Sequence, residues 1–226
     1  MNSPVFDKLL SLPLFLGIGR ADFMEIVARI RLGFNRKVEN AVIVDEGSLC
    51  SSLFFIISGS FCSVQQSDAR NYSFVEWYEA PMVLQPESLF GLTTRYTKLY
   101  RATSAVQYLE VDKRAISDIL FTYPTFRFNY LNLLSMQVQQ SKRKLWQKLP
   151  DTDTGKFISF VANRCAYPAG RKEIRISMEN LAGELQISRQ RVSQMLRALG
   201  NENLISLGRE RIEIPALEKL LQYKRT

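Results

Sequence analysis

The sequence contains no histidine, and this absence removes the residue that most often serves as a general base, a metal ligand or a haem ligand. It has only three cysteines, Cys50, Cys62 and Cys165, which are far apart. An odd, scattered set matches neither a disulfide framework nor a metal cluster, and an iron–sulfur centre needs about four clustered thiolates. We therefore predict no catalytic residue, no metal and no cofactor, and a reducing, cytoplasmic location.

Long apolar runs are also missing, because no stretch approaches the length of a membrane span. The run from Leu9 to Ile18 has the length of a signal-peptide core. Asp7 precedes it, however, Pro13 interrupts it, and no small-residue cleavage site follows. We interpret this run as a docking segment and expect no membrane partner.

The net positive charge lies in the C-terminal part of the chain. Residues 1–141 contain 13 Lys and Arg against 13 Asp and Glu, whereas residues 142–226 contain 17 against 9. The whole net charge of +8 therefore lies in the second segment. Such a basic segment would suit an anionic membrane or nucleic acid, but no long basic amphipathic helix occurs in it, so we favour nucleic acid.

The basic segment contains a pattern of two short helices joined by a tight turn, followed by a strand, between Ile176 and Ser206. Ser177 and Ser188 are candidate N-caps, and Gln186 and Ile187 form the turn. Apolar residues at helical spacing predict the buried positions, which are Leu181, Ala182, Leu185, Val192, Met195, Leu196 and Leu199. From periodicity alone, an amphipathic helical hairpin with a solvated outer face is the favoured interpretation.

The sequence of this segment resembles the helix-turn-helix of the bacterial cAMP receptor protein / fumarate-nitrate regulator (Crp/Fnr) family. The resemblance rests on Ser188-Arg189 at the start of the second helix and on the run Asn203 to Ser206, with Ala182 and Val192 at the expected interior places. It implies a winged helix-turn-helix that binds double-stranded DNA as a homodimer, with RNA polymerase as a further candidate partner. The turn departs from the family in carrying Gln186 instead of Gly, which predicts a left-handed residue.

The second helix presents short polar and cationic side chains, a set that hydrogen-bonds base edges and phosphates. The predicted base contacts come from its N-terminal half: Arg189, Gln190, Ser193 and Gln194. The predicted phosphate contacts are Ser177, Ser188, Arg191, Arg209 and Arg211. The family often has Glu and Arg where this chain has Gln190 and Gln194, so the family's usual DNA target does not carry over.

The N-terminal half has the pattern of an antiparallel β structure. Short β-rich runs at 42–44, 53–57, 61–64, 72–78 and 105–111 are separated by turn residues. Glu46-Gly47 and the run Leu53 to Ser60 resemble the sensory β-roll of the Crp/Fnr family. The predicted fold class is α+β: an N-terminal antiparallel, jelly-roll-type β-roll of the cyclic-nucleotide-binding kind (1–120), a long dimerisation helix (121–150) and a C-terminal winged helix-turn-helix domain (151–226).

A long helix is predicted from Thr125 to Leu149, started by Pro124. Alternating spacings of three and four place an apolar seam of the coiled-coil kind on it, formed by Leu131, Leu134, Val138, Ser141 and Leu145. Phe126, Tyr130 and Leu133 lie on another face. The seam alone also fits an ordinary core helix, but the corresponding helix of the family pairs two subunits, so we predict a dimer interface.

In the Crp/Fnr family the roll often carries a Gly-Glu pair that takes a ribose hydroxyl and an Arg-Ser pair that takes a cyclic phosphate. The corresponding residues here are Glu87, Gly91, Leu92, Arg95 and Arg101, where Leu92 replaces the Glu and no Arg-Ser pair follows. We predict an unknown effector other than cAMP, the alternative being a ligand-responsive regulator with a degenerate cassette. The aromatic run Tyr72 to Tyr78 could line an apolar ligand pocket or belong to the core.

A cupin-like enzyme with an appended basic domain is the remaining alternative. Cupin chemistry generally depends on a metal held largely by histidines, and this chain has none. We therefore predict that the protein is not an enzyme. Cys62 lies in an alternating strand, and no cation follows in sequence to activate it as a redox thiol, so a buried structural thiol is expected.

Overall fold

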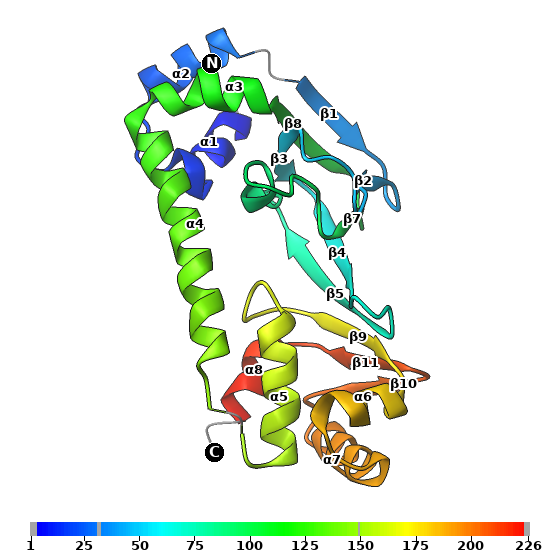
Figure 1. The fold of residues 1–226 in the computed structure, drawn as a ribbon. Coiled ribbons are helices and arrows are strands. Elements are labelled where there is room, and N and C mark those ends of the chain that lie inside the picture. The colour runs from blue at the N-terminus through cyan, green and yellow to red at the C-terminus, as the bar shows by residue number, and fades with distance from the viewer. Residues whose placement is uncertain (1–3, 31–32, 149, 224–226) are drawn as a thin grey trace. The chain divides into compact units, whose positions relative to one another are not determined.

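A computed structural model describes residues 4–30, 33–148 and 150–223 of the chain (Figure 1). Its internal contacts divide the chain into two units. Unit 1 comprises Met1–Phe61 and Glu79–Leu145, and unit 2 comprises Cys62–Tyr78 and Trp146–Thr226. The segment 62–78, which the sequence analysis placed in the sensory roll, therefore clusters with the C-terminal unit. None of the helices described is long and apolar enough to cross a membrane.

Unit 1 is built on an antiparallel β structure, as predicted. One sheet has the strand order β1(Gly33–Lys37), β8(Val106–Asp112), β3(Ser52–Ser58) and β6(Met82–Val83). A second pairing joins β2(Val42–Val44) to β7(Leu99–Ala102). The sequence pattern predicted β2, β3 and β8 but missed three strands of this unit. These are β1, whose residues are mostly exposed and do not alternate, β6, which has only two residues, and the four-residue β7.

Short helices cover the apolar side of this roll with aromatic side chains. They are α1(Pro4–Leu10), η1(Pro13–Phe15), α2(Arg20–Arg29), η2(Pro86–Ser88), α3(Lys113–Asp118) and η3(Leu120–Thr122). The ring of Phe15 packs against Phe23, Phe55 and Phe126 at centroid distances of 5.4, 5.4 and 5.3 Å. Leu9, Leu12 and Leu14 are buried as well. The N-terminal apolar run is therefore the docking segment that the sequence predicts.

The long helix is α4(Pro124–Leu145), which begins at the predicted proline. It ends four residues before Leu149, which itself lies outside the described residues, because residues 146–148 form a turn and coil. Phe126 and Tyr130 are buried on the predicted inner face. The predicted seam lies on another face of α4: Leu131, Val138 and Leu145 are 52%, 54% and 82% exposed, Ser141 is exposed and Leu134 is half-buried.

Unit 2 contains a compact helical domain and a small sheet. Its elements are β5(Tyr72–Glu79), α5(Asp153–Arg164), β9(Lys172–Ile176), α6(Met178–Leu185), α7(Arg189–Asn201), β10(Ser206–Gly208), β11(Arg211–Ile214) and α8(Leu217–Tyr223), with β4(Ser60–Gln66) leading into β5. The strand order within this unit is β10-β11-β9-β5. Phe157, Ile174, Leu181, Leu196 and Leu217 belong to one apolar core. Phe74 joins that core, so the aromatic run is core rather than the wall of a ligand pocket.

Candidate nucleic-acid interface

The helix pair α6 and α7 has the capping that the sequence predicts. The hydroxyl of Ser177 accepts a hydrogen bond from the Asn180 N–H at 3.1 Å, and the hydroxyl of Ser188 accepts one from the Arg191 N–H at 3.3 Å. Between the helices, Gln186 has φ 53° and ψ 47°, and its N–H bonds to the carbonyls at the end of α6. The predicted left-handed turn residue is confirmed. These caps fix where α7 begins and therefore which side chains lie at its exposed end.

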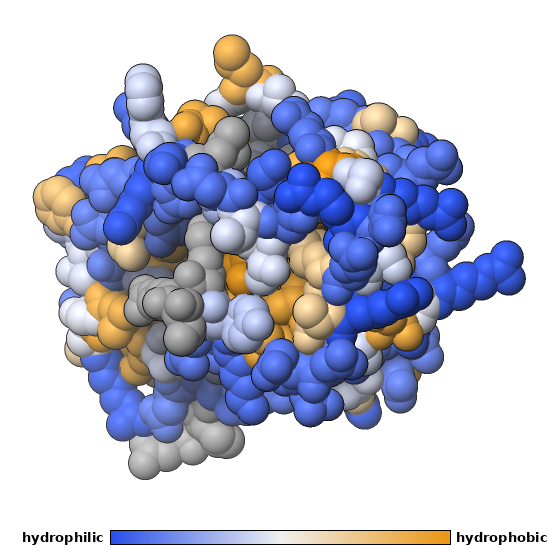
Figure 2. All heavy atoms as spheres, turned by 90° about the horizontal axis from the view of Figure 1, so that it is seen from below, coloured by the Kyte–Doolittle hydropathy of each residue, from blue (hydrophilic) through white to orange (hydrophobic). Residues whose placement is uncertain are grey.

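Helix α7 has one buried and one exposed face. Val192, Met195, Leu196 and Leu199 are buried against α5, α6 and the sheet of unit 2. The side chains of Arg189, Gln190 and Gln194 are exposed, and Ser193 is half-buried between them. Hydrophilic side chains predominate on the face seen from below, where α7 lies in the view of Figure 1 (Figure 2). All four predicted base-contacting residues therefore belong to one polar surface.

A two-stranded wing lies beside the N-terminal ends of α6 and α7. Strands β10 and β11 pair antiparallel, and the turn between them consists of Arg209 and Glu210, the latter with φ 52°. A groove of about 300 Å³ runs between the wing and the two helices, and its lining includes Ser177, Glu179, Arg189, Glu210 and Arg211. Of these, Ser177, Arg189 and Arg211 are residues that the sequence assigned to DNA. The fold therefore brings the helix and wing contacts to one groove.

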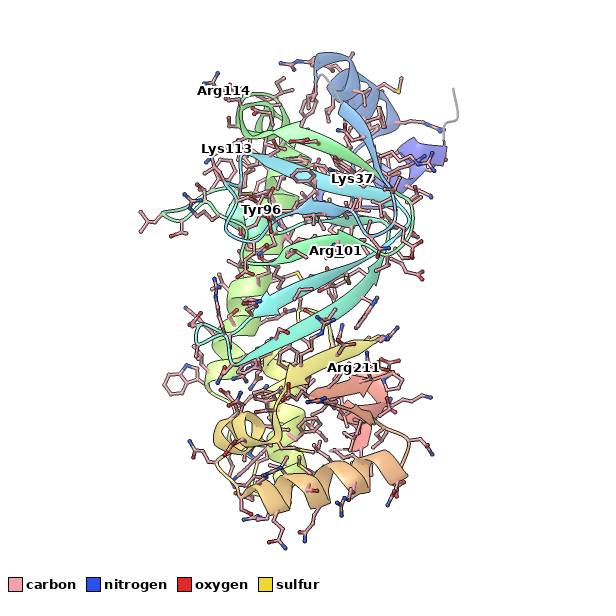
Figure 3. All side chains as sticks on the ribbon, turned by 90° about the vertical axis from the view of Figure 1, so that its right-hand side faces the viewer. Lys37, Tyr96, Arg101, Lys113, Arg114 and Arg211 are labelled. Carbon is pink, nitrogen blue, oxygen red and sulfur yellow. The ribbon has the colours of Figure 1, made fainter. Side chains whose placement is uncertain are left out.

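Carboxylates hold two of the predicted phosphate-binding arginines. The guanidinium of Arg191 donates two hydrogen bonds to Asp153, at 2.8 and 2.6 Å, which ties the start of α7 to the start of α5. Arg211, which projects from β11 (Figure 3), lies 2.8 Å from the Glu213 carboxylate and 3.9 Å from that of the buried Glu173. Sequence reasoning missed these partners, because no local spacing connects residue 153 to residue 191.

The comparisons with known proteins agree with this geometry. The model of the Crp-like helix-turn-helix domain matches residues 156–223. This segment is therefore similar to a Crp-like helix-turn-helix domain and is called the Crp-like domain below. No curated protein sequence matches the chain.

Solved structures extend the likeness over the chain at low sequence identity. Thermus thermophilus catabolite activator protein is 16% identical with a TM-score of 0.54, covering 94% of this chain and 97% of that one. The c-di-GMP responsive global regulator CLP from Xanthomonas campestris is 16% identical with a TM-score of 0.51, covering 86% and 99%. The sensor domain of the transcriptional regulator DNR from Pseudomonas aeruginosa is 16% identical with a TM-score of 0.52, covering 62% and 93%. These matches confirm the predicted fold class.

Upstream of the Crp-like domain, the residues that correspond to the phosphate cassette are exposed or form hydrogen bonds within the protein. Arg95 donates to the carbonyl of Gly47 at 2.6 Å, and Arg101 donates to that of Asn40 at 2.9 Å. Glu87 is exposed and accepts a hydrogen bond from Gln137 at 3.2 Å. Leu92 is fully exposed, and Gly91 has φ 105° in the same loop. Both arginines therefore stabilise loops in this structure.

A separate small cavity of about 180 Å³ lies in the roll, lined in part by Ser48, Ser52, Phe54, Tyr96 and Glu110. None of the five cassette residues lines it. The Tyr96 hydroxyl donates to the Ser52 carbonyl at 2.6 Å, and burial raises the pKa of Tyr96 far above its ordinary value. This volume is below the roughly 300–1,000 Å³ typical of small-molecule sites, so the cavity as it stands is too small for a nucleotide.

The three cysteines are all buried, and none forms a disulfide. Burial raises the pKa of the Cys50 thiol. Within the described ranges, no group of three or more Cys, Asp or Glu side chains is placed to hold a metal ion. The buried thiols match the expectation of structural cysteines.

Proposed function

We propose that this protein is a homodimeric, sequence-specific transcription regulator that binds a two-fold symmetric DNA site through α7. It has the fold of the Crp/Fnr-type DNA-binding regulators. The observation that supports the proposal most directly is the capped N-terminal end of α7, where Arg189, Gln190 and Gln194 are exposed on one surface. A recognition helix contacts base edges mainly through such residues.

The side chains of this surface suggest which bases are contacted. The guanidinium of Arg189 can bridge the O6 and N7 atoms of a guanine. Gln190 and Gln194 can each pair with an adenine through a carbonyl and an amide N–H, and Ser193 can bond to either kind of edge. Two such helices would occupy successive major grooves about 34 Å apart. The half-site should therefore combine guanine and adenine contacts.

Phosphate contacts would surround these base contacts. Ser177 and Ser188 use their hydroxyl oxygens as caps, which leaves each hydroxyl proton available for a phosphate. Arg209 lies exposed at the tip of the wing. Arg191 and Arg211 would have to share their guanidinium N–H groups between a phosphate and the carboxylates that hold them, so their contribution to affinity should be smaller than that of Arg209.

Homodimerisation through α4 completes the proposal. The seam of Leu131, Leu134, Val138, Ser141 and Leu145 is exposed or half-buried along a face of α4 that does not include Phe126. An apolar stripe of this kind on a single chain is typical of a helix that pairs with a second copy. A two-fold pair of chains would match a palindromic site.

The roll would respond to an effector other than cAMP. This part of the proposal is supported by Leu92 in place of the ribose-binding Glu and by the use of Arg95 and Arg101 as loop donors. RNA polymerase is the further partner expected of a transcription regulator. No observation on the described residues favours the cupin-like alternative.

Selection from a random DNA pool tests the proposal, and a two-fold symmetric consensus is the expected result. Arg189→Ala should then lower affinity for the selected site by about 1–3 kcal/mol and leave affinity for random DNA nearly unchanged. Arg209→Ala should weaken both equally, because a phosphate contact carries no sequence information. Lys219→Ala, on the exposed side of α8, is the matched loss of one charge and should change neither. If Arg189→Ala leaves the sequence preference intact, α7 is not the recognition helix.

A further inference from the structure

Strand β5 is hydrogen-bonded into the sheet of the Crp-like domain. It pairs antiparallel with β9 over five residues, from Tyr72 opposite Ile176 to Glu76 opposite Lys172. The other edge of β9 pairs with β11 of the wing. Without β5, the backbone N–H and C=O groups along one side of β9 would lack their partners and leave an open sheet edge. The 62–78 segment therefore supplies the fourth strand of this sheet.

Side chains of β5 complete the apolar core of the domain. Phe74 is buried, and its ring lies 5.6 Å from that of Phe160 on α5. The Tyr72 ring lies 5.5 Å from the same Phe160 ring. An aromatic side chain in such a position contributes a large buried area, and its removal leaves a cavity. The strand is thus part of the core and not a loose edge addition.

One buried ion pair fixes the register of the two strands. Glu76 and Lys172 are 2% and 1% exposed at their side chains, and their charged atoms lie 3.1 Å apart. The backbone N–H of Ala166, just beyond α5, donates to both carboxylate oxygens of Glu76, at 3.2 and 3.1 Å. A slip of β5 by one residue would turn Glu76 to the opposite face of the sheet and leave Lys172 buried without its partner, which is strongly unfavourable. The pair therefore specifies one alignment of β5 on β9.

The same segment is linked to the first helix of the helix-turn-helix directly at one point and through Arg164 of α5 at another. The side-chain amide of Asn180 on α6 donates to the carbonyl of Asn71 at 2.9 Å. Arg164 donates to the Tyr72 hydroxyl at 2.7 Å and to the Glu184 carboxylate on α6 at 2.8 Å. Neither contact involves the exposed residues of α7, so the segment supports the helix pair without covering its DNA-facing surface.

We propose that strand β5 is an integral strand of the Crp-like domain, locked by the Glu76–Lys172 pair, and that it holds α6 and α7 in their DNA-binding arrangement. Both ends of the 62–78 segment continue into unit 1, at Phe61 and at Glu79. This inference goes beyond the proposed function, and its structural part does not depend on DNA binding.

Hydrogen exchange on the full chain tests the structural part. Glu76→Ala leaves Lys172 buried without its partner, so the amides of residues 72–76 and 172–176 should lose about a hundredfold or more in protection together. Glu79→Ala changes an exposed glutamate at the end of the same strand and should leave both segments protected. Glu76→Gln, which keeps an acceptor for the Ala166 N–H, provides a milder variant should Glu76→Ala fail to fold, with a smaller joint loss. Unchanged protection of 172–176 in the Glu76 variants would overturn the proposal.

A disulfide tests the link to DNA binding. Ser73 and Arg175 lie directly opposite each other, at a separation that suits a disulfide in antiparallel strands. In the Ser73→Cys/Arg175→Cys variant, the oxidised form should bind the selected DNA site within about twofold of the reduced form, whereas Glu76→Ala should bind at least about tenfold more weakly. Failure of the bond to form, or loss of binding on oxidation alone, would contradict the proposal. If the unmodified chain binds no DNA, the proposed function fails, while hydrogen exchange still decides the strand assignment.

Discussion

Replacing two residues of the α4 seam by glutamate should separate the proposed dimer. Leu134 is half-buried and Val138 is 54% exposed in the single chain, so about half of each side chain remains to be covered by a partner. Full burial of such a side chain contributes about 1.5–3 kcal/mol, and half of that is roughly 1 kcal/mol. Two residues from each of two chains give about 4 kcal/mol, and the facing carboxylates add repulsion. The dimer dissociation constant should therefore rise by about a thousandfold or more.

Sedimentation equilibrium of the Leu134→Glu/Val138→Glu variant measures this change directly. Gln139→Glu/Gln140→Glu is the matched control, because it adds two carboxylates at exposed positions of the same helix outside the seam. The control should remain a dimer at concentrations where the seam variant is a monomer. An intact dimer after both seam substitutions would show that α4 does not form the interface.

Three further predictions follow from individual contacts. Gln186→Gly should stabilise the chain by about 1 kcal/mol in denaturant unfolding, because glycine adopts the observed positive φ without strain; an unchanged or lower midpoint would contradict this. Asp153→Asn should release Arg191 for a phosphate and steepen the salt dependence of DNA binding by about one counterion; a shallower slope would mean that the pair positions α7. Calorimetry with cyclic AMP or cyclic GMP should show no micromolar binding. Tight binding of either nucleotide would contradict the prediction that the effector is not a cyclic nucleotide.

Local features of the Crp-like domain could be predicted because each is encoded by adjacent residues. Ser177 and Ser188 cap the helices that follow them, and the hydroxyl-to-amide bonds involve residues only three positions away. The buried stripe of α7 follows from helical periodicity alone. Even the strained turn could be anticipated, since Gln186 has to take the conformation that glycine takes in related turns.

Features that depend on distant partners could not be predicted. The run from Tyr72 to Tyr78 has the composition of a buried strand in any sheet, and nothing within it indicates that β9, about 100 residues later, is its neighbour. The ion pair between Glu76 and Lys172 could not be predicted either, because the sequence does not show that Lys172 is buried. The same holds for Asp153 and Arg191, whose pairing arises only when α5 packs against α7.

The arginines discussed above differ in the partners of their guanidinium groups. These partners matter more for DNA binding than the net charge of the chain does. Arg95 and Arg101 donate to loop carbonyls, and Arg191 and Arg211 face carboxylates. Within the described part of the chain, no ion pair or hydrogen bond holds the side chains of the two remaining arginines of the interface, one at the start of α7 and one at the tip of the wing. The net charge of +8 already offsets paired arginines against their carboxylates, so it does not tell which cations are ready to displace counterions from DNA. Among the four arginines of the interface, specificity and affinity should depend most on Arg189 and Arg209.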